Sequence, residues 1–144
     1  MIVIGDTSGL VAALNVSDQE HDAARKALGQ ASATVVSPLV ILEIEHITTR
    51  NVGRRAADTV KDWLLQQERT LRVLIPNVSA DLLRKARSVQ NRYGSLNLDL
   101  TDAVNVVLAE TYETDCVLTL DRRDFRAVRP LSGHQAFRVL PDDL

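Results

Sequence analysis

Two acidic residues in this sequence follow apolar runs at positions where they could take part in chemistry. Asp6 comes soon after the run at residues 1–4, and Asp121 comes directly after the run at residues 115–120. Such runs of β-branched and aliphatic residues predict buried strands, and the carboxyl ends of parallel strands meet at the ligand-binding edge of a sheet. Asp6 could instead simply cap the helix that follows it.

Two further acids lie near the starts of apolar helical stretches. Glu43 lies about one turn inside the stretch 39–46, on the side that is expected to face inward. Asp102 opens the almost wholly apolar stretch 102–109, which belongs in the interior. Asp99 stands three residues earlier and fits the N-cap of that helix. One acid suffices for a cap and a second one adds repulsion, so capping explains Asp102 less completely.

The four carboxylates together predict a site for a divalent cation. Unpaired carboxylates crowded into one crevice would repel one another, and a hard cation removes that conflict. Oxygen ligands, without cysteine or histidine at matching positions, favour Mg²⁺ or Mn²⁺ over Zn²⁺. Such ions activate water and stabilise the attacking and leaving oxygens of phosphodiester hydrolysis. These residues therefore indicate the chemistry of a nuclease.

The elements expected around the acids explain how they could converge. Strands are expected at residues 1–4, 34–36, 72–75, 115–120 and 137–139, with helices in the segments between them. One of these helices, at residues 19–28, is expected to end at Gly29. The alternation predicts an α/β fold, a three-layer α/β/α sandwich around a central, mainly parallel sheet of four to five strands.

The composition is that of a single domain spanning residues 1–144. The chain is 45% hydrophobic and 25% charged, and its net charge of -2 neither attracts nor excludes nucleic acid as a whole. Cys116 is the one cysteine, so an internal disulfide is excluded and a reducing compartment fits. No apolar run approaches the length that a bilayer requires, and no targeting segment is visible. We therefore expect a cytoplasmic protein without a membrane partner.

Four short motifs occur in order along the whole chain. They are Asp-Thr-Ser after the first strand, Ser-Pro-Leu-Val-Ile-Leu-Glu, Leu-Asp-Leu-Thr-Asp-Ala before an apolar helix, and Leu-Thr-Leu-Asp-Arg-Arg-Asp-Phe. In this order the motifs resemble a PIN domain and, more narrowly, the VapC toxins of bacterial type II toxin–antitoxin modules. One departure is Gly5, where an apolar strand residue is usual. It loosens the strand end but removes no ligand.

The resemblance implies a set of functional residues. The acidic quartet that holds Mg²⁺ or Mn²⁺ and carries catalysis would be Asp6, Glu43, Asp102 and Asp121. Ser8 and Thr119 match positions that support the site by hydrogen bonding. Asp124 matches a frequent additional acid, and Asp99 remains a cap that supports the site from outside the ligand set.

The resemblance also implies an activity and partners. It implies a Mg²⁺-dependent endoribonuclease, the toxin of a bacterial toxin–antitoxin pair, that hydrolyses RNA with metal-activated water. It implies a homodimer that is silenced by a cognate antitoxin, whose C-terminal segment enters the active-site groove.

Other interpretations of the same residues differ in class. A haloacid-dehalogenase-type phosphatase would need a second acid two residues after Asp6, where Ser8 stands. A non-catalytic binding module would be expected to have lost at least one of the four acids. The remaining alternative is a housekeeping or structure-specific PIN-like nuclease that acts on RNA or DNA, since metal-assisted hydrolysis is indifferent to the 2′-hydroxyl. The chain lacks the extra length for an arch or duplex-binding element.

Attraction to RNA must come from local cationic groups, because the chain is net acidic. Arg122 and Arg123 directly follow Asp121, within side-chain reach of a phosphate next to the cleaved one. They belong to the richest basic cluster of the chain, which also includes Arg126 and Arg129. Alternatively, both are solvated or pair with surface acids.

Overall fold

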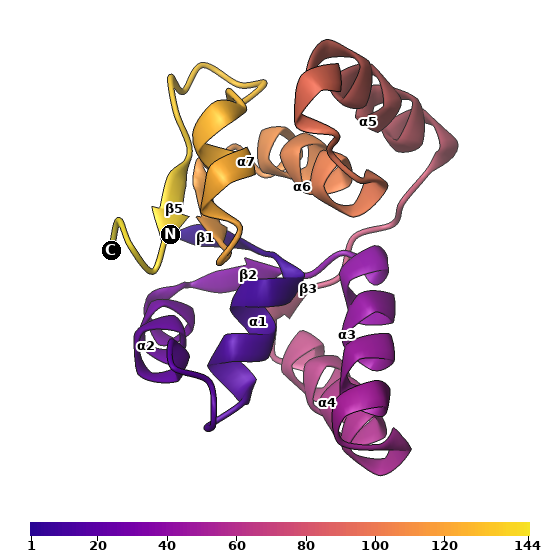
Figure 1. The fold of residues 1–144 in the computed structure, drawn as a ribbon, viewed down its shortest axis with the longest axis vertical. Helices are drawn as coiled ribbons and strands as arrows, with labels where there is room; N and C mark the ends of the chain where they lie inside the picture. The colour runs from indigo at the N-terminus through magenta and orange to yellow at the C-terminus, as the bar shows by residue number, and fades with distance from the viewer.

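The computed structural model describes residues 1–144 and contains five strands, seven α-helices and one 3₁₀ turn (Figure 1). Along the chain, the elements are β1 (Ile2–Gly5), α1 (Thr7–Leu14), α2 (His21–Gln30), β2 (Ala33–Val35), α3 (Pro38–Asn51), α4 (Arg54–Arg69), β3 (Val73–Leu74), α5 (Ala80–Arg92), η1 (Gly94–Leu96), α6 (Leu100–Thr111), β4 (Cys116–Leu118), α7 (Arg122–Ala127) and β5 (Arg138–Leu140). Helices separate each strand from the next, as the sequence pattern predicts.

The five strands form one parallel sheet in the order β3-β2-β1-β4-β5. The first strand of the chain is therefore the central one, with β2 on one side and β4 on the other. After β3 the chain crosses back over the sheet to form β4 and β5. The strand order thus reverses between β1 and β4, and ligands of open α/β sheets bind outside the carboxyl ends of the strands at such a point.

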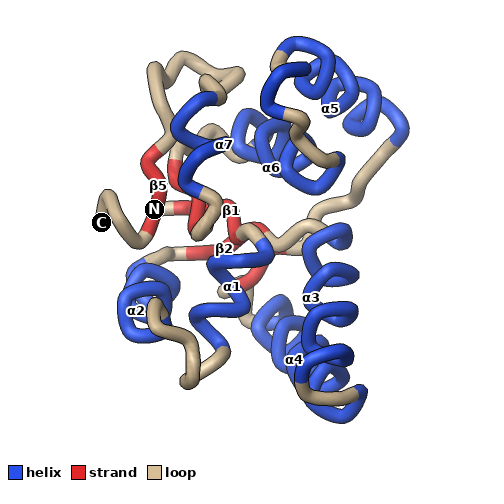
Figure 2. Tube along the Cα trace, viewed as in Figure 1, coloured by secondary structure: helices blue, strands red, loops and turns tan.

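Helices cover both faces of the sheet, so the predicted three-layer α/β/α sandwich is confirmed. Figure 2 shows α1 to α4 on one side of the strands and α5 to α7 on the other. Neighbouring residues of β1 point to opposite faces, as strand geometry requires. Val3 packs into a cluster with Leu10 and Leu64, whereas Ile4 packs into a second cluster with Phe125.

Side-chain caps mark the N-terminal ends of three helices, at Ser37 for α3, Ser79 for α5 and Asp99 for α6. Ser37 caps α3 by accepting the Leu39 backbone N–H at 3.1 Å, and Pro38 occupies the first helical position, where its missing N–H costs nothing. The expected end of a helix at Gly29 is wrong, because α2 continues through this residue to Gln30. Gly29 keeps a negative φ instead of the left-handed conformation that a glycine cap adopts.

None of the helices combines the length and the hydrophobicity that crossing a bilayer requires.

Candidate active site

A pocket of about 420 Å³ opens beside the point where the strand order reverses, and five carboxylates line it. We call it the acidic pocket; its charged residues are Asp6, Glu43, Asp99, Asp102 and Asp121. They reach it from the end of β1, from α3, from the start of α6 and from the segment after β4. The structure thus brings together all four acids of the expected quartet.

Asp6 is the most deeply buried of these acids, with 4% of its surface exposed. Its Oδ2 accepts the Thr119 hydroxyl at 2.7 Å, and its Oδ1 accepts the Asn105 side-chain amide at 3.2 Å. Burial raises the pKa of the Asp6 carboxyl to about 6, although the Thr119 hydrogen bond opposes the shift. Asp6 occupies the N-cap position of α1 but makes no side-chain cap hydrogen bond, so capping does not account for it.

Glu43 connects three helices through its two carboxylate oxygens. Its Oε1 accepts the Thr7 hydroxyl of α1 at 2.5 Å, and its Oε2 accepts the Thr101 hydroxyl of α6 at 3.0 Å. The side chain is half-buried, as its position on the inward side of α3 predicts. Both hydroxyls restrict its rotation, so the carboxylate is held toward the pocket that it lines.

Two acids at the start of α6, Asp99 and Asp102, have different roles. Asp99 caps the helix, because its Oδ1 accepts the Asp102 backbone N–H at 2.9 Å. The carboxylate of Asp102 itself accepts no backbone N–H of this helix. Burial raises the pKa of Asp102 to about 8, and the charges of Asp6, Asp99 and Asp121 add to the shift.

The carboxylate oxygens fit a hard divalent cation. One oxygen each from Asp102, Asp121 and Asp124 lie within 4.8 Å of one another. The pKa of Asp124 is raised by burial and by the Asp121 charge, and the Arg123 charge opposes this shift without cancelling it. A donor set made only of carboxylates suits Mg²⁺ or Mn²⁺ better than Zn²⁺.

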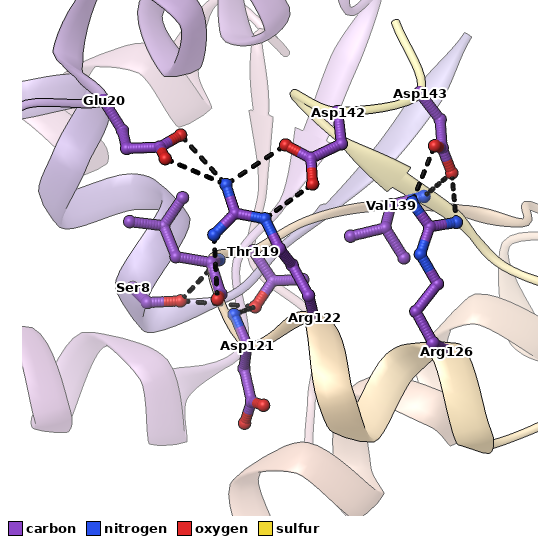
Figure 3. A network of polar contacts seen from close by, with 10 residues as sticks. Ser8, Glu20, Thr119, Asp121, Arg122, Arg126, Val139, Asp142 and Asp143 are labelled. Carbon is purple, nitrogen blue, oxygen red and sulfur yellow. Dashed lines mark hydrogen bonds and ion pairs between the residues drawn. The ribbon is translucent and has the colours of Figure 1, made fainter.

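Two hydroxyls hold the backbone that carries Asp121 (Figure 3). The Leu120 N–H donates to Ser8 Oγ at 2.9 Å, and the Asp121 N–H donates to Thr119 Oγ1 at 2.9 Å. These two N–H groups bind side chains and not a neighbouring strand, so β4 ends before them, earlier than the sequence pattern predicts. In Figure 3 the Asp121 carboxylate points away from this network and remains available to the acidic pocket.

The two candidate substrate-binding arginines lie in different surroundings. Both carboxylate oxygens of Glu20 accept from Arg122 Nη2 at 3.0 Å, and Asp142 accepts from Arg122 Nε and Nη2 (Figure 3). These two acids raise the pKa of the Arg122 guanidinium above its usual range. Arg123 is exposed and forms no ion pair. Only Arg123 therefore has a guanidinium that is free of carboxylates.

Three residues that hold Asp6 and Glu43 by hydrogen bonds are absent from the sequence-based set: Thr7, Thr101 and Asn105. Asn105 is fully buried, and its Oδ1 is the one buried side-chain polar atom without a hydrogen-bond partner. A signal for it exists in the sequence, since it is the lone amide in the apolar stretch 103–109, three residues after Asp102. The two threonines carry no comparable signal.

Comparisons with known proteins agree with this geometry. Residues 3–130 match the family described as PIN domain. The chain is 35% identical over 140 residues to "Ribonuclease VapC26" of Mycobacterium tuberculosis, covering 96% of this chain and 100% of that protein.

Two solved structures are similar in shape. The crystal structure of Mycobacterium tuberculosis VapC20, described as a sarcin–ricin loop cleaving toxin, has a TM-score of 0.72 at 22% identity, over 84% of this chain and 91% of that one. The structure of VapBC2 from Rickettsia felis bound to a promoter DNA fragment has a TM-score of 0.66 at 16% identity, over 91% and 96%. At these identities the two structures establish the fold alone.

Proposed function

The chain belongs to the PIN-domain family, and from this premise we propose that it is a divalent-cation-dependent endoribonuclease, the toxin of a bacterial toxin–antitoxin pair. The observation that carries the proposal is the acidic pocket, where carboxylates from both halves of the chain surround one cavity. A relative at 35% identity over nearly the whole chain is named a ribonuclease, which supports RNA as the substrate.

We propose that the cation is Mg²⁺, with Mn²⁺ able to replace it. Asp6, Glu43, Asp102 and Asp121 would hold it, and Asp124, which has a carboxylate oxygen within 4.8 Å of those of Asp102 and Asp121, would support them. When bound, such an ion supplies a Lewis acid for the phosphodiester and lowers the pKa of water.

The chain's own residues orient the acids. Thr119 and Asn105 fix both oxygens of Asp6, whereas Thr7 and Thr101 fix both oxygens of Glu43. Carboxylates held by hydrogen bonds need little reorganisation when substrate binds, and this preorganisation is a major source of enzymatic rate. Without a cation, the same carboxylates would repel the phosphates of RNA.

We propose a protein partner that reaches the acidic pocket, as expected of an antitoxin. An apolar groove of about 200 Å³ runs between α1, α3 and α4, and Ile47 lines both this groove and the acidic pocket. Val52 also lines the groove and is 76% exposed. The fold similarity to VapBC2 supports such a partner. We further propose a homodimer, and a strict monomer in light scattering at micromolar concentration would contradict it.

The test is cleavage of single-stranded or looped RNA by the purified protein. We expect cleavage with Mg²⁺ or Mn²⁺, none with EDTA, and a loss of at least about 100-fold in Asp102→Asn. Asp62→Asn is the matched control, because this exposed acid of α4 makes no hydrogen bond or ion pair. Undiminished cleavage in EDTA would refute the metal mechanism. Equal cleavage of DNA with the same sequence would favour the alternative nuclease.

A further inference from the structure

A second pocket, of about 440 Å³, lies between the C-terminal end of α5 and the loop 129–135. Figure 1 shows this loop, which follows α7, beside the end of α5. No acidic residue lines this second pocket, in contrast to the acidic pocket. We call it the cationic pocket; its polar and charged side chains include Arg92, Tyr93, Arg129, Ser132 and His134.

Both arginines of the cationic pocket have free guanidinium groups. The side chains of Arg92 and Arg129 take part in no hydrogen bond and no ion pair, unlike those of Arg122 and Arg126. Two like charges that share one cavity without a carboxylate repel each other, and a bound anion relieves this repulsion. Guanidinium groups also match the oxygens of a phosphate better than an ammonium does.

The frame around these arginines is held by hydrogen bonds. Tyr93 Oη accepts the Arg129 backbone N–H at 3.2 Å, which fastens the loop to the end of α5. Ser132 Oγ and His134 Nδ1 lie 2.9 Å apart within the loop. A smaller cavity of about 210 Å³, lined in part by Lys85 and Ser88 of α5, shares Arg92 with the cationic pocket. Lys85 pairs with Glu110 at 3.8 Å, so the unpaired positive charge is that of Arg92 and Arg129.

The two pockets are close enough for one RNA strand to reach both. Tyr93 precedes Asp99 by six residues, and an extended chain of that length spans at most about 22 Å. Asp121 is the N-cap of α7 and Arg129 directly follows its C-cap, Val128, and the six helical residues between the caps rise only about 9 Å. A single strand therefore needs only a few nucleotides to pass from one pocket to the other.

We propose that the cationic pocket binds a backbone phosphate of the RNA a few nucleotides away from the bond that is cleaved at the acidic pocket. This inference rests on the proposed function and names the part of the surface that holds its substrate. Five carboxylates surround the cleavage site and the chain is net acidic, so attraction must come from cations outside that site. Arg122 is bound to Glu20 and Asp142, whereas Arg92 and Arg129 are free. Phosphate contacts position the strand without reading its sequence.

The test compares two double variants that remove the same charge. Arg92→Ala/Arg129→Ala should raise the KM for a 20-nucleotide RNA by about 10-fold, with a smaller change in kcat. It should also reduce the slope of log affinity against log salt by roughly 1.4, since each phosphate contact on a single strand contributes about 0.7. Arg25→Ala/Arg69→Ala is the control, because both arginines are exposed and form no ion pair. The control should match the wild type.

RNA length and a conservative variant sharpen the test. The ratio of wild-type to variant kcat/KM should grow with RNA length and be smallest for a trinucleotide, which cannot reach both pockets. Arg92→Lys/Arg129→Lys keeps the charge without the planar fork and should restore part of the affinity. Thermal unfolding of each variant checks that it is folded.

The outcomes separate this inference from the proposed function. If the wild type cleaves no RNA under any metal condition, the proposed function fails. If the wild type cleaves RNA and Arg92→Ala/Arg129→Ala keeps its KM and salt slope, the inference alone is overturned. It is also overturned if the control loses as much affinity, or if the variant loses only inorganic phosphate binding or only binding of the antitoxin.

Discussion

Replacing Asp6 by asparagine should stabilise the metal-free protein at pH 8 and have much less effect at pH 4. The Asp6 carboxyl has a pKa of about 6 in the folded chain, against 3.8 for an unperturbed aspartate. Between these two values the folded state binds more protons than the unfolded state. The free energy of unfolding therefore falls as the pH rises through this window. Asparagine has nearly the same shape and no charge, so the variant lacks this dependence.

The magnitude follows from the difference of about 2 between the two pKa values. At 1.36 kcal/mol for each pKa unit, the buried charge destabilises the fold by about 3 kcal/mol at pH 8, and by only about 0.5 kcal/mol at pH 4. The amide faces Thr119 and Asn105 with different hydrogen-bonding groups, which costs about 1 kcal/mol at either pH. Comparing the two pH values cancels this second effect. Asp102 adds to the difference, because the Asp6 charge also raises its pKa.

Urea unfolding in EDTA at the two pH values measures the effect. The difference in free energy of unfolding between Asp6→Asn and wild type should be about 2 kcal/mol more favourable at pH 8 than at pH 4. Asp62→Asn removes an exposed acid and should follow the wild type at both. An Asp6→Asn difference that is the same at pH 4 and pH 8 would mean that burial does not destabilise this carboxylate, and the reasoning would be refuted.

Other expectations concern packing, metal and the Asp121 segment. Gly9→Ala should lower the free energy of unfolding in urea by about 2–3 kcal/mol, because the new Cβ would lie 2.4 Å from a backbone oxygen of β4. Gly29→Ala should raise it by about 0.5–1 kcal/mol, because the new Cβ meets nothing within 4 Å. Equal effects of the two variants would contradict this reasoning. Millimolar Mg²⁺ should raise the Tm of the wild type by several degrees and raise that of Asp102→Asn less, as measured by calorimetry. Arg122→Ala should lower the kcat for RNA cleavage about 10-fold by loosening the segment after β4, whereas Arg126→Ala should keep the wild-type kcat. Equal kcat values in the two variants would argue against a positioning role for Arg122.

Local patterns were sufficient to predict the architecture. Apolar runs and caps such as Ser37 depend on near neighbours in the chain, so they indicate the α/β sandwich without knowledge of the tertiary structure. Gly29 wrongly predicted the end of α2, because a glycine can end a helix but can also remain within one. The acids at strand ends could be found for the same reason, since the carboxyl edge of a parallel sheet is a predictable place.

Contacts between distant segments set the limit of that prediction. Thr101 and Glu43 are separated by 58 residues, and Arg122 and Glu20 by 102. No spacing rule relates such pairs, because only the tertiary fold brings the start of α6 to α3, and the N-cap of α2 to the start of α7. The sequence therefore indicated a basic cluster beside Asp121 but not which of its arginines already has carboxylate partners.

The reversal of strand order at β1 also affects when the site can exist during synthesis. Asp6 and Thr119 meet across 113 residues, and Ser8 and the Leu120 backbone across 112, so the surroundings of Asp6 are incomplete until residues 119 and 120 have been made. The ribosome adds Asp121 115 residues after Asp6. A product of interrupted translation that stops before Thr119 carries Asp6 without this partner and lacks Asp121 altogether. Completion of the acidic pocket therefore requires synthesis to reach Asp121.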